Sequence, residues 1–122
     1  MYASVRHYRV GAGSIDSLMH RVDEEFAPAI GQEPGFVAYV ALDTGDATVE
    51  TVSIFHDKEA ADASNDLAAD YVRENLGEFG LTLTGVSGGE VFVSRVTAEA
   101  LDDAHRWRSD RARRRALSAT AA

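Results

Sequence analysis

The sequence predicts an α+β domain with elements in the order β-α-β-β-α-β. The stretch 36–42 is apolar at every position, turn residues follow at 43–46, and 48–56 alternates as a strand does, which predicts a hairpin. Apolar residues recur at helical spacing on either side of this hairpin, and β-forming residues lie further out on both sides. Right-handed crossovers would place both helices on one face of a four-stranded antiparallel sheet.

Local signals place the first strand and the first helix. Residues 2–10 are rich in β-forming residues and predict a strand. The helix is expected over 15–30, because Ser14 is a good N-cap and apolar residues follow at intervals of three and four. Pro28 cannot donate a backbone hydrogen bond, so we expect the helix to fray or kink after Phe26.

The second half of the chain repeats this order. Asp57 is the expected N-cap of a second helix. Five glycines fall within 77–89, so this stretch predicts a connecting loop, with room for a brief extended piece at Leu81–Leu83, and 90–96 predicts the last strand. The sequence therefore predicts a domain over 1–96, followed by a C-terminal helix and an arginine-rich tail over 97–122.

The predicted order β-α-β-β-α-β is that of a ferredoxin-like arrangement. Within it, the apolar strand over 36–42 indicates an oligomer. One of its faces is formed by Phe36, Ala38, Val40 and Leu42, and the other by Val37, Tyr39 and Ala41. A strand that is apolar on both faces requires cover on both. Because both helices lie on one face of the sheet, we expect a homodimer in which a second copy covers the other face.

Composition excludes several kinds of site. The 122 residues include no cysteine, which excludes disulfides, thiol catalysis and cysteine-ligated metals. The N-terminus lacks the apolar core of a signal peptide. No stretch approaches the ~20 apolar residues that span a bilayer, so we expect a cytoplasmic protein without a membrane partner.

Charge is distributed unevenly along the chain. Residues 1–104 carry a net charge of −13, whereas residues 105–122 carry six arginines and a net charge of +5. This tail, with Trp107, would bind nucleic acid through phosphate contacts and stacking, or would fold back onto acidic surface. The acidic body repels a polyanion, so the second interpretation is favoured and nucleic acid is not an expected partner.

The first strand carries three candidate catalytic residues, Arg6, His7 and Tyr8. Alternation places Ser4, Arg6 and Tyr8 on one face and His7 on the other. Arg6 and Tyr8 would hydrogen-bond a phenolate or another oxyanion, and His7 would act as a general base. In the alternative interpretation, Arg6 pairs with one of the many carboxylates and His7 lies in the dimer interface.

The second helix carries three candidate substrate-binding residues, Ser64, Tyr71 and Asn75. They share one face with small residues such as Ala60 and Ala68, which would leave room above the sheet. In the alternative interpretation, this face packs closely as core and Tyr71 reaches the surface with its hydroxyl.

Motifs for metals and cofactors are lacking. The four histidines show no metal-ligand spacing. Gly11 and Gly13 lie between a predicted strand and helix, but Asp16 stands where the third glycine of a dinucleotide motif belongs. No hydrolase nucleophile motif occurs. We therefore expect neither a metal nor a cofactor.

Two stretches carry a resemblance to a known family: PGFVAY at 34–39 and VSIFHDKEA at 52–60. Over about residues 2–96 the sequence resembles the antibiotic-biosynthesis-monooxygenase-like branch of the dimeric α+β barrel superfamily. The resemblance implies a dimeric barrel and enzymes that often need no cofactor. Such enzymes aid the deprotonation of an electron-rich aromatic substrate, whose anion then reduces dioxygen. The superfamily also holds haem-degrading enzymes, isomerases and proteins without known activity.

The haem-degrading relatives use an Asn on the first strand, then a Trp and a His on the second helix. Matched without gaps, these positions fall near Arg6, Ser64 and Glu74, so none of the three residue types is retained.

Two functions follow from the sequence and the resemblance. The first is a cofactor-independent monooxygenase, or a related small-molecule enzyme, acting on an aromatic or polyketide-like substrate between sheet and helices. The alternative is a non-catalytic homodimer that binds a small ligand or has a purely structural role. A pocket lined by Arg6, Tyr8, Ser64 and Tyr71 would favour the first, and a filled core with these side chains paired internally would favour the second.

Overall fold

The structure is a computed structural model that describes residues 1–97. Its elements are β1 (Tyr2–Arg9), α1 (Ile15–Arg21), a π-helical segment η1 (Val22–Phe26), α2 (Ala27–Gly31), β2 (Phe36–Gly45), β3 (Thr48–Phe55), α3 (Lys58–Asn75), a 3-10 turn (Gly77–Phe79) and β4 (Thr82–Glu90). The strands pair in the order β2-β3-β1-β4, and all pairings are antiparallel. The predicted ferredoxin-like fold is confirmed.

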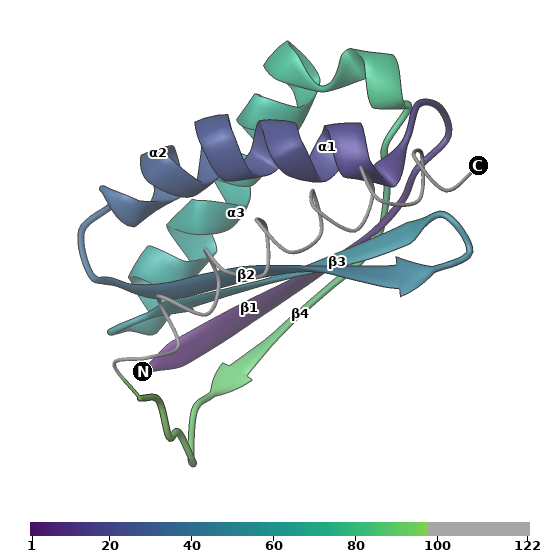
Figure 1. Cartoon of the computed structure of the whole chain (residues 1–122). Coiled ribbons are helices and arrows are strands. Elements are labelled where there is room, and N and C mark those ends of the chain that lie inside the picture. Colours follow the sequence, from purple (N-terminus) through teal and green to yellow (C-terminus); the bar gives the residue numbers. More distant parts are fainter. Residues whose placement is uncertain (98–122) are drawn as a thin grey trace. The chain divides into compact units, whose positions relative to one another are not determined.

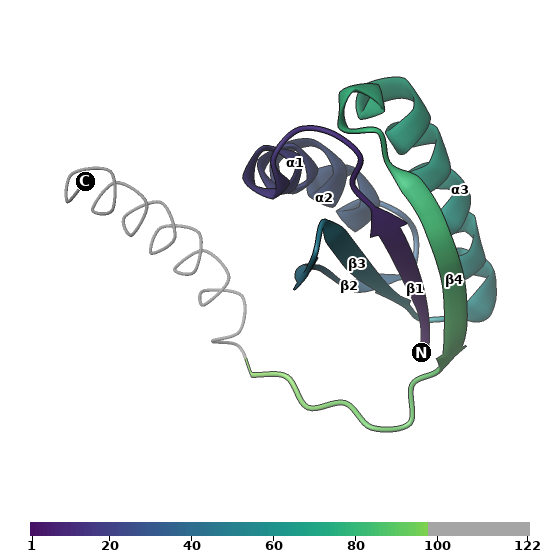
Figure 2. The ribbon, with the colours of Figure 1, turned by 90° about the vertical axis from the view of Figure 1, so that its right-hand side faces the viewer.

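Residues 1–91 form one compact unit with two layers. Figures 1 and 2 show α1, α2 and α3 on the same face of the sheet. Helix α2 packs against β2, and α3 packs against β1 and β3. Within residues 1–91 no helix covers the other face, where the side chains of Val40 and Leu42 are exposed.

The first helical stretch contains a π-helical turn. The stretch begins at the predicted N-cap Ser14, whose hydroxyl accepts a backbone hydrogen bond from the first turn. Ala27 N–H donates to the carbonyl of Val22, five residues back, which widens this turn. Pro28 follows in the first turn of α2 and has no N–H to donate. An irregularity was expected after Phe26, and the structure places it just before, in the π-helical turn that ends at Phe26.

The hairpin is longer and its turn is tighter than predicted. Strand β2 runs through the expected turn residues to Gly45. The chain reverses at Asp46 and Ala47, which have φ angles of 52° and 59°. Positive φ at both central positions is the pattern of a type I′ turn, whose twist suits a two-residue hairpin connection.

A β-bulge at Val37 corrects the predicted faces of β2. The pairing with β3 shifts between Phe36 and Ala38, so Phe36 stands opposite Phe55 and shares the helix-covered face with Tyr39. Strict alternation places Phe36 and Tyr39 on opposite faces, but one extra residue reverses the side chains that precede it. Both aromatic rings consequently join the core.

The last strand lies earlier in the sequence than predicted. Strand β4 occupies the glycine-rich stretch that was expected to be a loop, and residues 91–97 contain no strand. A Cβ at Gly88 would lie 3.0 Å from Cε1 of Tyr2 and 3.1 Å from the backbone oxygen of Ala3. Glycine here permits the close approach of β1, a role that strand propensity does not register. The predicted position of this strand is therefore wrong.

The C-terminal helix and arginine-rich tail were predicted over 97–122, and residues 98–122 of this segment, with Trp107, lie outside the described residues. Among the helices of residues 1–97, none has the combination of length and apolar character that crossing a membrane requires.

Candidate small-molecule site

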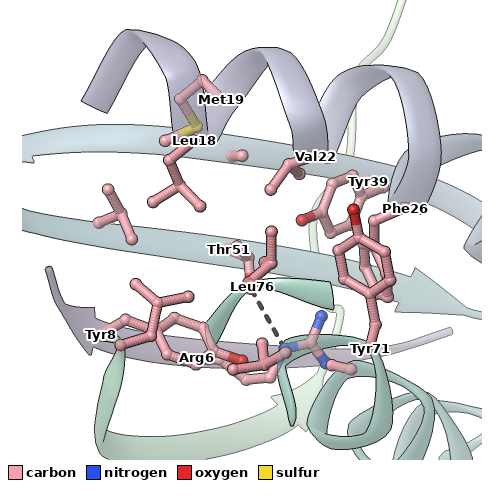
Figure 3. A pocket seen from close by; sticks show the side chains of 15 residues that line it. Arg6, Tyr8, Leu18, Met19, Val22, Phe26, Tyr39, Thr51, Tyr71 and Leu76 are labelled. Atoms are coloured by element: carbon pink, nitrogen blue, oxygen red, sulfur yellow. Dashed lines mark hydrogen bonds between the residues drawn. The ribbon is translucent and has the colours of Figure 1, made fainter. Parts of the chain in front are cut away.

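A cavity, partly open to the surface, lies between the sheet and the helices. Its walls come from β1, β2 and β3 of the sheet and from α1, η1 and α3 of the helical layer (Figure 3). Of the 15 lining residues Arg6 alone is charged, and four are the aromatic residues Tyr8, Phe26, Tyr39 and Tyr71. The cavity has a volume of about 40 Å³. Ligand pockets usually have volumes of about 300–1,000 Å³, so a ring-shaped ligand requires this cavity to widen.

Arg6 projects from the middle of β1 into this cavity and is only 2% exposed. Its Nε donates to Oγ1 of Thr51 (3.2 Å) and its Nη2 to Oγ of Ser53 (2.8 Å). Its Nη1 donates to Oδ1 of Asn65 on α3 (2.9 Å). The register of β1 and β3, with Arg6 opposite Thr51, sets the two hydroxyls beside the guanidinium. All three acceptors are neutral.

No carboxylate neutralises this guanidinium within residues 1–97, where none of the ion pairs involves Arg6. The interpretation in which Arg6 pairs with an acid therefore does not describe this part of the chain. Taking a lone cation out of water is costly, and hydrogen bonds to neutral groups offset only part of that cost. Among the residues that the structure describes, no carboxylate therefore compensates the positive charge on the floor of the cavity.

Three tyrosines surround the cavity together with Arg6. Burial raises the pKa of Tyr8, while the charge of Arg6 and a hydrogen bond from it act in the opposite direction. Burial also raises the pKa of Tyr39. Burial and the Glu25 carboxylate raise the pKa of Tyr71 to about 12. All three hydroxyls thus keep their protons near neutral pH, so none supplies a negative charge to Arg6.

A hydrogen-bond network joins the helices beside the cavity. The Tyr71 hydroxyl donates to Oε2 of Glu25 (2.6 Å), and Glu25 accepts from Nε of Arg21 (3.2 Å). Arg21 also donates to Glu78 and to the backbone oxygen of Asn75 (2.7 Å). The hydrogen bond from Tyr71 lowers the pKa of Glu25, and the charge of Arg21 lowers it further. The network links the π-helical segment to α3 and to the turn that follows it.

Three of the six predicted site residues line the cavity, namely Arg6, Tyr8 and Tyr71. His7 lies on the opposite face of the sheet, because neighbouring residues of a strand point to opposite sides. Its Nδ1 lies 2.8 Å from Oε1 of Glu50.

The remaining two predicted residues, Ser64 and Asn75, lie on α3, which begins at the predicted cap Asp57. Neither belongs to the lining of the cavity. The Ser64 hydroxyl is buried and donates to the carbonyl of Ala61 (2.6 Å). Asn75 is exposed, and its side-chain amide donates to the backbone oxygen of Tyr71 (3.3 Å).

The structure adds site residues that the sequence analysis missed. Thr51 and Ser53 hold Arg6 from β3, Asn65 holds it from α3, and Tyr39 contributes its ring from β2. One signal was available for two of them. Thr51 and Ser53 lie between Val49 and Phe55 on the face of β3 that becomes buried. Polar groups on such a face require hydrogen-bond partners.

The fold, unlike the sequence, matches known proteins. No protein-family model and no curated protein matches the sequence. A protein of unknown function from Nitrosomonas europaea matches with a TM-score of 0.63 and 18% identity, over 80% of this chain and 94% of that one. The monooxygenase ActVA-Orf6 of Streptomyces coelicolor, solved in complex with nanaomycin D, matches with a TM-score of 0.57 and 15% identity, over 80% of this chain and 92% of that one. The haem-degrader MhuD of Mycobacterium tuberculosis matches with a TM-score of 0.57 and 22% identity, over 79% of this chain and 100% of that one.

A proposed antibiotic biosynthesis monooxygenase from Chloroflexus aurantiacus and a dimeric ferredoxin-like protein are also among the matches. The chain has the fold of the antibiotic-biosynthesis-monooxygenase-like proteins. At these identities the similarity establishes the monooxygenase-like fold, and the chemistry has to be argued from the residues that line the cavity.

Proposed function

We propose that this protein binds a small aromatic molecule in the cavity between sheet and helices and oxygenates it without a cofactor. The lining of the cavity carries the proposal, because four aromatic side chains surround one buried arginine. Aromatic faces suit a planar ligand, and Arg6 is placed to hydrogen-bond an oxygen atom on it. Proteins with a similar fold were solved with nanaomycin D and with haem bound.

The proposed chemistry assigns Arg6 the main role. A phenolic or enolic substrate loses a proton, and its anion passes electrons to dioxygen. Where a CH₂ group becomes a carbonyl, one oxygen atom stays on carbon and the other leaves with both hydrogens as water, so no further reductant is consumed. Arg6 would stabilise the substrate oxyanion and lower its pKa, and Tyr8 would donate a second hydrogen bond. Tyr71 would contact the ring.

The proton of the substrate would leave to water. No carboxylate or histidine belongs to the lining that residues 1–97 form, and the tyrosines hold their own protons. Stabilisation of the anion by a fixed cation makes a dedicated base unnecessary for a substrate that is already acidic, such as a quinol or an anthrone.

Haem does not fit this site. His7, His20 and His56, the histidines within the described residues, do not line the cavity. The lining tyrosines have raised pKa values, which disfavours the phenolate form that would bind iron. The donor set of the cavity therefore offers haem iron no ready axial ligand.

We infer that two copies assemble through the uncovered face of the sheet. Val40 and Leu42 are 52% and 44% exposed there, and Val5, Val52 and Ile54 share this face. Large exposed apolar patches mark interaction sites, and a second copy offers an identical apolar surface. A dimeric ferredoxin-like protein shares the fold.

A second candidate function is binding without catalysis, and the lack of a base in the cavity favours it. Oxygen uptake measured with anthrone and with substituted quinols, beside calorimetric binding of the same compounds, separates the two. Uptake that matches the loss of substrate supports the oxygenase. Binding without uptake supports the ligand-binding alternative, and the lack of both contradicts each of them.

A further inference from the structure

We propose that the cavity selects an anionic ligand, and that Asn65 maintains this selectivity because it is an amide rather than a carboxylate. The inference rests on the proposed ligand-binding function and adds the charge class of the ligand, an aromatic monoanion with its charge on one carboxylate, phenolate or enolate group. The surroundings of Arg6 carry the argument.

Burial of Arg6 carries a large desolvation cost. The side chain is 2% exposed, and its hydrogen-bond acceptors, which are hydroxyl groups and one side-chain amide, are all neutral. Arginine is rarely buried to this extent without an acid, because hydrogen bonds to neutral acceptors do not fully offset the free-energy cost of desolvating the cation. A ligand anion that completes the pair would recover this energy.

The guanidinium of Arg6 is accessible to a ligand in the cavity. Arg6 lines the cavity, so a ligand inside it reaches the guanidinium. Three hydrogen bonds hold Nε, Nη1 and Nη2 in place, which fixes the direction of the remaining N–H groups. A cation that is ordered before binding loses little entropy when an anion arrives.

Within residues 1–97, no carboxylate of the chain competes with a ligand anion for Arg6. The chain has a net charge of −8, yet the cavity lining within residues 1–97 contains no carboxylate. Glu25 reaches Tyr71 but is exposed and paired with Arg21. Glu50 is paired with His7 on the other face of the sheet. The positive charge of the site is therefore left for a ligand.

Asn65 is the position at which this selectivity can be removed. Its Oδ1 accepts from Nη1 of Arg6 (2.9 Å) and from the hydroxyl of Ser4 (2.8 Å). Aspartate has the same shape and would accept both hydrogen bonds, so Asn65→Asp preserves the geometry. It would also give Arg6 an internal counter-ion, which removes the reason to bind an external anion.

The test compares two probes of equal size, 2-naphthoate and its neutral amide 2-naphthamide, by isothermal titration calorimetry at low salt. We expect the wild-type protein to bind 2-naphthoate about tenfold or more tightly than 2-naphthamide, since hydrogen bonds to charged groups are the stronger ones. In Asn65→Asp we expect this preference to disappear while the melting temperature stays equal or rises.

The matched control is Gln32→Glu, which makes the same amide-to-carboxylate change at an exposed position after α2. It should keep the preference for 2-naphthoate. Equal binding of the two probes by the wild-type protein would overturn the anion selectivity and leave the proposed aromatic ligand intact. A preference that persists in Asn65→Asp would overturn the role of Asn65.

If neither naphthalene probe binds, the proposed binding of an aromatic molecule is contradicted. A second measurement then tests the anion site by itself. The cavity volume of about 40 Å³ admits a small anion without widening. Sodium nitrate should then raise the melting temperature of the wild-type protein and of Gln32→Glu more than that of Asn65→Asp. Equal shifts in all three proteins would overturn the anion site as well.

Discussion

The hydroxyl of Tyr71 donates a hydrogen bond of 2.6 Å to Oε2 of Glu25, and this bond closes the wall of the cavity between α3 and the π-helical segment. Tyr71 lines the cavity with its ring while its hydroxyl reaches an exposed carboxylate. The cavity volume of about 40 Å³ is far below that of a usual ligand pocket, so an aromatic ligand has to separate these elements. We expect the wall to open at this point, because the π-helical turn that carries Glu25 interrupts the regular α-helical hydrogen bonding on either side of it.

Tyr71→Phe is expected to reduce stability most above the ordinary pKa of Glu25. The hydrogen bond from Tyr71 lowers the pKa of Glu25 from 4.5. A depressed carboxyl pKa contributes stability that is present above pH 4.5 and is lost as the pH falls through the folded-state pKa. Chemical unfolding from pH 7 to pH 3 should therefore show the two proteins converging in acid. A constant difference across this range would contradict the assignment.

The same variant should admit a ligand faster. Stopped-flow mixing with 2-naphthoate is expected to give a higher association rate for Tyr71→Phe than for the wild-type protein, because opening no longer breaks a hydrogen bond. An unchanged rate would show that Tyr71 and Glu25 do not limit entry.

Ala68→Leu should abolish binding of an aromatic ligand. Ala68 is buried on α3 and lines the cavity, so a larger side chain would fill it. We expect a loss of stability of about 1–3 kcal/mol from overpacking, with a folded protein remaining. Ala69→Leu makes the same change at the next, exposed position and should leave calorimetric binding of 2-naphthoate unchanged. Undiminished binding by Ala68→Leu would place the ligand elsewhere.

Val40→Asp should disrupt the proposed homodimer. Val40 stands opposite Val52 on the uncovered face of the sheet, and a charge there would be buried without a partner in a sheet-to-sheet assembly. Light scattering is expected to show a dimer for the wild-type protein at micromolar concentration and a monomer or unfolded chain for the variant. Ala63→Asp, on an exposed position of α3, should remain dimeric. A folded wild-type monomer would contradict the assembly.

Gly88→Ala and Gly89→Ala test the position of β4. A Cβ at residue 88 meets Tyr2 and the backbone of Ala3, whereas a Cβ at residue 89 meets nothing within 4 Å. We expect Gly88→Ala to cost about 1 kcal/mol or more through crowding, and Gly89→Ala to be neutral or slightly stabilising. Urea unfolding of both variants gives the comparison. Equal stabilities would fit a loop at these residues rather than a strand beside β1.

Much of the fold follows from signals that lie close together in the chain. Ser14 and Asp57 cap helices where expected, because a capping side chain reaches only its own first turn. Strand alternation placed Arg6 and Tyr8 on one face and His7 on the other, because neighbouring side chains along a strand point to opposite sides. These features depend on neighbours within a few residues, and the sequence displays those neighbours directly.

Other features depend on neighbours that are distant in the chain. Gly88 reads as a loop residue until the ring of Tyr2 is known to lie against it, and the bulge at Val37 appears only in the pairing of two strands. The setting of Arg6 is the clearest case. The sequence by itself determined that the cation Arg6 shares one face of the first strand with Ser4 and Tyr8, and it left open which face is buried. Only the tertiary structure, by bringing Ser53 and Asn65 to that cation from 47 and 59 residues away, decided that its partners are neutral. Polar residues on separate elements leave no periodic trace, because periodicity records the direction of a side chain and not what it meets.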